Sequence, residues 1–161
     1  NSRASTADAT EDPLFVRWLA SAVALAEHYT QRSIGTQTLE LALDEFPAGP
    51  IELLRGPVTS ITSITYVDSA GVTQTLSNTL YTLDDYGLQC WALPKMDTDW
   101  PETAATANAV KVRYVAGDLN PAVMVALMRA VAFQFENREA TSDDVLAFIS
   151  SQLDPVKVWS F

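Results

Sequence analysis

The stretch IELLRGPVTSITSITYVDSAG, residues 51–71, decides the fold of this chain. It is rich in β-branched residues and small hydroxyls, which disfavour a helix and favour a strand. Val58, Ile61 and Ile64 follow one another at a spacing of three, and the next aromatic residue follows after two. A strand with a β-bulge near residues 62–63 reconciles these spacings, because a bulge inserts one extra residue into a strand.

The same region predicts the first of two β-hairpins. Gly56-Pro57 sets the direction in which the strand begins, since proline locks its own φ and restricts the residue before it. Residues 68–71 (DSAG) are typical of a turn, and residues 72–76 (VTQTL) then return as the second strand. Residues 81–93 (YTLDDYGLQCWAL) indicate another hairpin, which turns at residues 84–87.

Two other segments show the alternation of half-buried strands. Residues 36–46 (TQTLELALDEF) place three leucines on one side and acids on the other. Residues 108–117 (NAVKVRYVAG) place Val110, Val112 and Tyr114 on one side. We therefore expect both segments to lie in a sheet with one face toward a core.

Three helices are expected outside these strands. The first runs from Pro13 to about Arg32, with Asp12 as its N-cap. The second follows Asn120 as cap, and the short third helix has Ser142 as cap. The apolar positions of the first helix are Phe15, Trp18, Leu19, Ala22, Val23, Ala26 and Tyr29. Those of the second helix are Met124, Leu127, Met128, Val131, Ala132 and Phe135.

The order helix, strands, helix, helix is typical of the α+β class. We expect a small antiparallel β-sheet of hairpins, flanked by a long N-terminal helix and a C-terminal helical pair. At 161 residues the chain is most simply one domain. We place this domain at residues 12–153, between a flexible N-terminal arm at residues 1–11 and an extended C-terminal tail at residues 154–161.

The charge balance disfavours tight binding of nucleic acid. The chain has 20 acidic residues against 10 basic ones, a formal net charge of −10, whereas binding to phosphate draws on clustered Lys and Arg. The acid excess favours solubility, or alternatively forms an acidic surface that a partner passes without binding. No apolar run reaches the ~18 residues needed to span a bilayer, so no membrane partner is expected. The single cysteine, Cys90, excludes an internal disulfide.

The residues form no pattern that indicates catalysis or a cofactor. His28 is the only histidine, and the sequence has no Gly-x-Ser-x-Gly motif that would supply the serine of a nucleophilic triad. The glycines are scattered rather than gathered in a phosphate-binding loop. Asp97 and Asp99 have the spacing that begins a calcium loop, but Glu102 stands where such a loop needs glycine. We therefore expect no catalytic residue, no cofactor and no metal site.

Several segments, taken in order along the chain, resemble one known family. The segments are RSIGTQTLELALDEFP at residues 32–47, LRGPVTSITSITYV at 54–67, VKVRYVAGD at 110–118, NPAVMVALMRAVAFQFENREA at 120–140 and LDPVKVW at 153–159. They are similar to the phage head-tail connector (adaptor) proteins of long-tailed phages and prophages, which are often labelled as DNA-packaging proteins. The resemblance covers the chain from about Asp12 to its last residue. It departs from the family at Leu-Arg-Gly-Pro, where Leu-Pro-Arg-Gly-Pro is commoner.

This resemblance implies a structural role without catalysis, cofactor or metal. Such proteins form a ring, expected to have about twelve subunits, that docks under the portal protein and leads to a downstream stopper or tail-completion protein. DNA passes through the ring without specific binding. Residues 12–153 would then be a single connector domain. The protein would lie in the neck of the virion, between head and tail, and in the bacterial host cytoplasm before assembly.

The candidate contact residues lie on three segments. The hydroxyl-rich strand would turn a flat polar face toward a neighbouring subunit, although an ordinary solvated strand face explains it equally well. The loop at residues 94–107 and the C-terminal tail would reach partners, or alternatively form a surface loop and a strand of their own subunit. The candidate subunit or partner contacts are Thr62, Ser63, Thr65, Trp100, Trp159 and Phe161, and the candidate channel-facing acids are Asp97, Asp99 and Glu102.

Two other functions compete with this interpretation. The alternative is a non-catalytic binding module of unknown ligand, and an uncharacterised hydrolase that uses the loop at residues 94–107 is less favoured. Catalysis would need a titrating acid with a shifted pKa in a pocket. Annular particles in solution would favour the connector over both alternatives.

Overall fold

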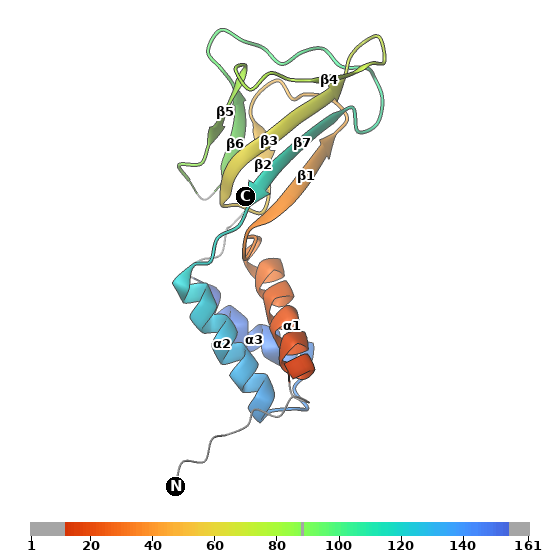
Figure 1. Cartoon of the computed structure of the whole chain (residues 1–161). Helices are drawn as coiled ribbons and strands as arrows, with labels where there is room; N and C mark the ends of the chain where they lie inside the picture. Colours follow the sequence, from red (N-terminus) through yellow and green to blue (C-terminus); the bar gives the residue numbers. More distant parts are fainter. Residues whose placement is uncertain (1–11, 88, 155–161) are drawn as a thin grey trace. The chain divides into compact units, whose positions relative to one another are not determined.

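The computed structural model describes residues 12–87 and 89–154, and contacts between residues divide the chain into two compact units (Figure 1). Residues 12–30 and 119–154 form the helical unit, and residues 31–118 form the sheet unit. The α+β class is confirmed. That both units act as one connector domain over residues 12–153 stays a prediction.

The helical unit contains α1 (Asp12–Thr30), α2 (Pro121–Glu136) and α3 (Ser142–Leu153), and each of these helices packs on the other two. At 19 residues α1 has the ordinary length of a globular helix, so the expectation of a long helix is wrong. It ends earlier than predicted because Gln31 takes a left-handed conformation, with φ of 55°.

The N-cap of α2 is the residue predicted from the sequence, whereas the N-cap of α3 is not. The side chain of Asn120 accepts a hydrogen bond from the backbone N–H of Ala122, at 2.9 Å, as predicted for the start of α2. The predicted cap of α3, Ser142, is instead its first residue, and Thr141 is the N-cap. Thr141 is preferred because Asp144 completes a reciprocal capping box with it.

The apolar stripe predicted for α2 lies mostly on the wrong side of the helix. The residues that α2 buries are Val123, Ala126, Leu127, Ala130 and Gln134. Met128 and Phe135, two of the largest members of the predicted stripe, are exposed. The helix is apolar on both sides, so periodicity alone selected the side with the bulkier residues.

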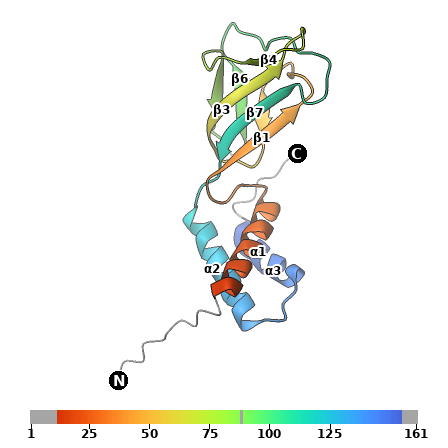
Figure 2. The same ribbon diagram turned by 45° about the vertical axis from the view of Figure 1, so that its right-hand side comes forward.

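The sheet unit contains two antiparallel sheets. The four-stranded sheet has the order β1 (Gln37–Leu43), β7 (Val110–Ala116), β3 (Val58–Val67) and β4 (Thr73–Thr75) (Figure 2). The three-stranded sheet has the order β2 (Ile51–Leu53), β6 (Cys90–Pro94) and β5 (Tyr81–Asp84). Both predicted hairpins, β3–β4 and β5–β6, are confirmed by their strand pairings.

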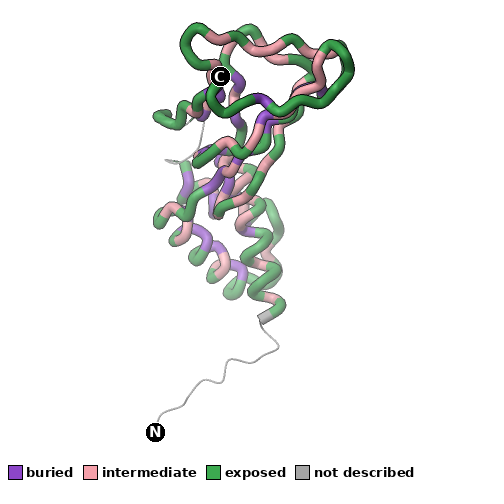
Figure 3. The backbone as a smooth tube through the Cα atoms, turned by 45° about the horizontal axis from the view of Figure 1, so that its top comes forward, coloured by how far each residue is buried: buried purple, intermediate pink, exposed green. Residues whose placement is uncertain are grey.

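The two sheets share one hydrophobic core. Its buried members from both sheets are Ile51, Leu53, Val58, Ile64, Leu76, Tyr81, Cys90, Ala92, Val110, Val112, Tyr114 and Ala116. The buried residues of this unit lie mostly on its strands, and Figure 3 shows exposed stretches of backbone between buried ones. Cys90 is a small core residue, as the sequence suggested, and its Sγ accepts a hydrogen bond from the N–H of Val58.

Strand β3 carries two bulges rather than one. Its pairing with β7 shifts between Val58 and Ser60 and again between Ile61 and Ser63. The predicted bulge near residues 62–63 is therefore confirmed, and a second bulge precedes it. The extra residues keep the apolar side chains of β3 on the core side in spite of their spacing of three, and they leave the hydroxyls on the opposite side.

Candidate interaction surfaces

The outward side of the four-stranded sheet is built of small hydroxyl side chains. Ser63 lies opposite Arg113 and Thr65 lies opposite Lys111, on the side away from the core. Thr62 is the extra residue of its bulge and is exposed. We use the name hydroxyl face for the side formed by Thr38, Ser60, Thr62, Ser63, Thr65, Thr73 and Thr75. The structure thus brings the three predicted β3 residues together on one face.

Two cations stand in the middle of the hydroxyl face. Lys111 and Arg113 alternate with the buried valines of β7 and are exposed. Arg113 donates a hydrogen bond from Nη2 to Oε2 of Glu40 at 2.9 Å, and both side chains are about half exposed. Such an exposed pair contributes little to stability, on the order of 0.2–1 kcal/mol. The face is therefore polar, with short hydroxyl side chains around two long cationic ones, of which Arg113 is paired with Glu40.

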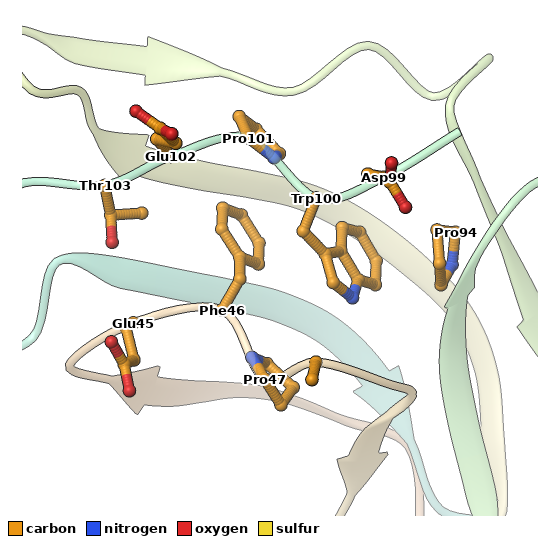
Figure 4. Close-up of a pocket in the computed structure, with 10 residues that line it drawn as sticks. Glu45, Phe46, Pro47, Pro94, Asp99, Trp100, Pro101, Glu102 and Thr103 are labelled. Atoms are coloured by element: carbon orange, nitrogen blue, oxygen red, sulfur yellow. The ribbon is translucent and has the colours of Figure 1, made fainter.

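The loop between β6 and β7 forms a pocket around Trp100 (Figure 4). The indole stacks on Phe46 with 5.1 Å between ring centroids and 6° between ring planes. Phe46 also meets the edge of Tyr66, at 5.6 Å. The indole Nε1 donates a hydrogen bond to the carbonyl oxygen of Gly49 at 2.9 Å. Trp100 is therefore held by the sheet unit itself, and one of its faces lines a hollow of about 430 Å³.

Three carboxylates surround this Trp100 pocket. Glu45, Asp99 and Glu102 line it together with the aromatic pair and are exposed. Asp97, the third predicted channel acid, is exposed but does not line the pocket. Carboxylates beside aromatic faces suit a cationic side chain, since both favour positive charge.

The sequence predicted only part of this pocket. It singled out Trp100 and two of the acids, and it missed Glu45 and Phe46 at the end of β1. No local signal identifies Phe46, because the alternation that turns Leu39, Leu41 and Leu43 toward the core would turn Phe46 the other way.

The described residues contain no metal-ligand cluster, and their two buried tyrosines have a raised pKa. Within residues 12–87 and 89–154, no three His, Cys, Asp or Glu side chains gather to hold a metal ion. Burial raises the pKa of Tyr81 and of Tyr114, which keeps both hydroxyls neutral. The hydroxyl of Tyr114 donates to the carbonyl of Leu54 at 2.9 Å, a structural bond. Among the described helices none is long and apolar enough to cross a membrane.

Two predicted contact residues lie outside the described residues. Trp159 and Phe161 belong to the segment after residue 154. Their roles stay predictions.

Comparison with solved structures finds the same fold in chains of gene transfer agent particles. A chain in "Virion of native gene transfer agent (GTA) particle" is 21% identical, with a TM-score of 0.72 over 94% of this chain and 80% of that one. A chain in "Neck of empty GTA particle computed with C6 symmetry" is 22% identical, with a TM-score of 0.69 and the same coverage of both chains. A chain in "Neck of native GTA particle computed with C12 symmetry" is 24% identical, with a TM-score of 0.62 over 94% of this chain and 86% of that one.

No family model matches this chain, and no curated protein matches it. At identities of 21% to 24% the likeness shows a shared fold across nearly the whole chain. A shared fold does not by itself determine a function.

Proposed function

We propose that this protein is a structural component of the neck of a phage-type virion, where it forms a ring beneath the portal and links head to tail. The observation that supports the proposal most strongly is the fold shared over 94% of the chain with a chain of a particle neck computed with C12 symmetry. A ring of about twelve subunits is part of the proposal. No catalytic step and no cofactor belong to it.

A closed ring needs two different flanks on each subunit, because its contacts are head to tail. The hydroxyl face is one candidate flank. Thr62, Ser63 and Thr65 offer hydrogen bonds to a neighbour, and the long side chains of Lys111 and Arg113 extend from the same face. Lys111 adds positive charge that favours an acidic neighbour surface, whereas Glu40 offsets the charge of Arg113.

The Trp100 pocket is the candidate contact with a different neck component. Its aromatic floor and the carboxylate of Glu45 suit a Lys or Arg side chain from the portal protein or from a downstream stopper or tail-completion protein. Trp159 and Phe161 are proposed as further partner contacts.

The loop acids are proposed to face the DNA channel. Asp97, Asp99 and Glu102 are exposed on the loop between β6 and β7. Carboxylates repel phosphate, and each Lys or Arg contact would instead add salt-sensitive affinity. Neutralisation of all three should slow DNA passage, and an unchanged phage titre would contradict a channel position.

The proposal is tested by assembly with the portal protein of the same phage. We expect co-purification, and image averages of the complex should show an annular layer beneath the portal. A protein that binds no head or tail component and forms no ring would overturn the proposal. The virion neck is the expected location, with the bacterial host cytoplasm before assembly, and labelling of purified virions would test it.

A non-catalytic binding module is the second candidate, and the Trp100 pocket is the observation that favours it. In that case the isolated protein should bind a Lys- or Arg-containing peptide without assembling. A peptide array read against wild type and Trp100→Ala tests binding at the pocket, and assembly with the portal protein separates the two functions, because only the neck component should form a ring.

A further inference from the structure

Helix α2 is apolar on nearly all sides, although only one side faces the core of its unit. Its 16 residues include only two charged side chains, Arg129 and Glu136. Opposite the buried side, Val125, Met128 and Phe135 are exposed by 48%, 65% and 42%. A helix that is hydrophobic all round is normally buried all round. The outer side of α2 is therefore built to be covered.

Helix α1 extends this apolar surface. Phe15, Val16 and Leu19 are exposed, and with Met128 and Val131 they line a hollow of about 320 Å³ between α1 and α2. The ring of Phe15 stacks on that of Phe135 at 5.8 Å, so the surface is continuous across both helices. We define the apolar helical patch as Phe15, Val16, Leu19, Val125, Met128, Val131 and Phe135.

The area of the patch matches one side of a specific interface. Six of its residues are exposed, all except Val131. Their exposed fractions together equal about three fully exposed large side chains, or roughly 450–500 Å² of apolar surface. A standard interface buries about 800 Å² per partner, of which about 57–65% is apolar, or roughly 460–520 Å². The patch is thus large enough to supply the apolar part of such a contact.

The opposite flank of the same unit has complementary properties. Because the three helices pack on one another, the hollow between α1 and α2 faces away from α3. The solvent side of α3 has an exposed stripe at i, i+4 and i+8, formed by Asp143, Ala147 and Ser151. Two of these side chains are small, so another helix can approach closely. Asp143 adds negative charge, whereas the guanidinium of Arg138 lies 5.4 Å over the ring of Phe135 at the edge of the patch.

We infer that the apolar helical patch binds the α3 face of a second copy of this chain. This inference rests on the proposed ring and assigns its apolar contact to the helical unit, with the hydroxyl face as an additional polar contact. The apolar groove of one copy receives Ala147 and Ser151 of the next, and Arg138 meets Asp143. The contact joins unlike flanks, as a closed ring requires.

The test is self-association measured by sedimentation over a range of concentrations. Wild type should associate, and Met128→Glu should remain monomeric, because a carboxylate on the patch would be buried without a partner. Met96→Glu is the matched control. Met96 is 90% exposed and belongs to the sheet unit, so this variant should associate like wild type. Circular dichroism and urea midpoints check that both variants stay folded.

A mixing experiment identifies the second flank. Ala147→Arg should also be monomeric, yet it retains an intact patch, while Met128→Glu retains an intact α3 face. An equimolar mixture of the two variants should form heterodimers and nothing larger. Association of Ala147→Arg at the wild-type level would overturn the assignment to α3.

Three results separate this inference from the proposed function. Association of Met128→Glu at the wild-type level overturns the inference, and so does a wild type that is monomeric at every concentration. Neither result overturns the neck function, which is tested separately by binding to the portal protein. Association through the patch without binding to any head or tail component overturns the neck function and leaves the contact between copies intact.

Discussion

Trp100 and Phe46 stack with their rings almost parallel, 5.1 Å apart, although one lies in the loop before β7 and the other follows β1. Nε1 of the indole also donates to the carbonyl of Gly49. The loop that carries the candidate acids is thereby tied at two points to the loop between β1 and β2. This attachment restricts the positions of Asp99 and Glu102 more than a free surface loop would.

Trp100→Ala should lower the free energy of unfolding of the sheet unit by about 2 kcal/mol. The value is below the cost for a fully buried aromatic because Trp100 is only half-buried. The change removes the stack and the bond to Gly49 together. Urea unfolding followed by circular dichroism measures it. Trp100→Phe retains a ring over Phe46 and should cost only about 1 kcal/mol; an equal loss in both variants would contradict a contribution from stacking.

Local chemistry predicted the strands better than it predicted the pocket. The alternation of β1 and β7 and the turn residues of both hairpins depend on neighbours in the sequence. The second bulge of β3 also had a signal, since two successive spacings of three require two extra residues. The contact of Phe46 with Trp100 had none, because it forms only when distant loops meet in the folded chain.

Thr62→Arg should weaken ring assembly about tenfold if the hydroxyl face lies between subunits. Thr62 is exposed on its bulge, so a long side chain there leaves the subunit folded and obstructs a neighbour. Sedimentation or image analysis of assembled rings measures the effect. Thr79→Arg, an equally exposed change in the loop before β5, is the matched control. Equal assembly of the two variants would identify the face as ordinary solvated surface.

Asp68 should titrate below the usual range of an aspartate. Its carboxylate accepts a hydrogen bond from Nε2 of Gln74 at 2.8 Å, and this bond is the main cause of the lowered pKa. The N–H groups of Val72 and Ala70 also donate to it. Because the folded-state pKa is depressed, the stabilisation is present above the ordinary pKa and is lost as the pH falls through the folded-state pKa.

A carboxyl titration followed by NMR tests this assignment. Gln74→Ala should raise the pKa of Asp68 toward its ordinary value, because the first of the three donors is removed. Thr75→Ala changes the adjacent residue of β4 without touching the carboxylate and should leave the titration unchanged. A carboxyl group that titrates at its ordinary value in wild type would show that the turn does not hold the anion.

The helices show a different limit of prediction from sequence. Periodicity correctly indicates that α2 has an apolar stripe at Met128 and Phe135, but it cannot say whether the same chain or another molecule covers that stripe. The core side of α2 uses smaller residues such as Ala126 and Ala130, because the three helices approach closely there. Met128 and Phe135 are left largely exposed, whereas Phe133 stacks on Phe148 of α3.

Gly117→Ala should destabilise the sheet unit by about 3 kcal/mol or more. Gly117 follows β7 with φ of 99°, and a Cβ atom there would lie 2.0 Å from the carbonyl oxygen of Gly35. That oxygen belongs to the backbone, so relief requires the chains to separate. Gly117 also donates its N–H to the carbonyl of Pro57 at 2.8 Å, so the separation would disturb the start of β3.

Gly71→Ala, with φ of 81° and no atom within 4 Å of the new Cβ, is the control and should cost only about 1–2 kcal/mol. Urea midpoints of the two variants measure the difference, and equal midpoints would mean that the contact between Gly117 and Gly35 relaxes without cost.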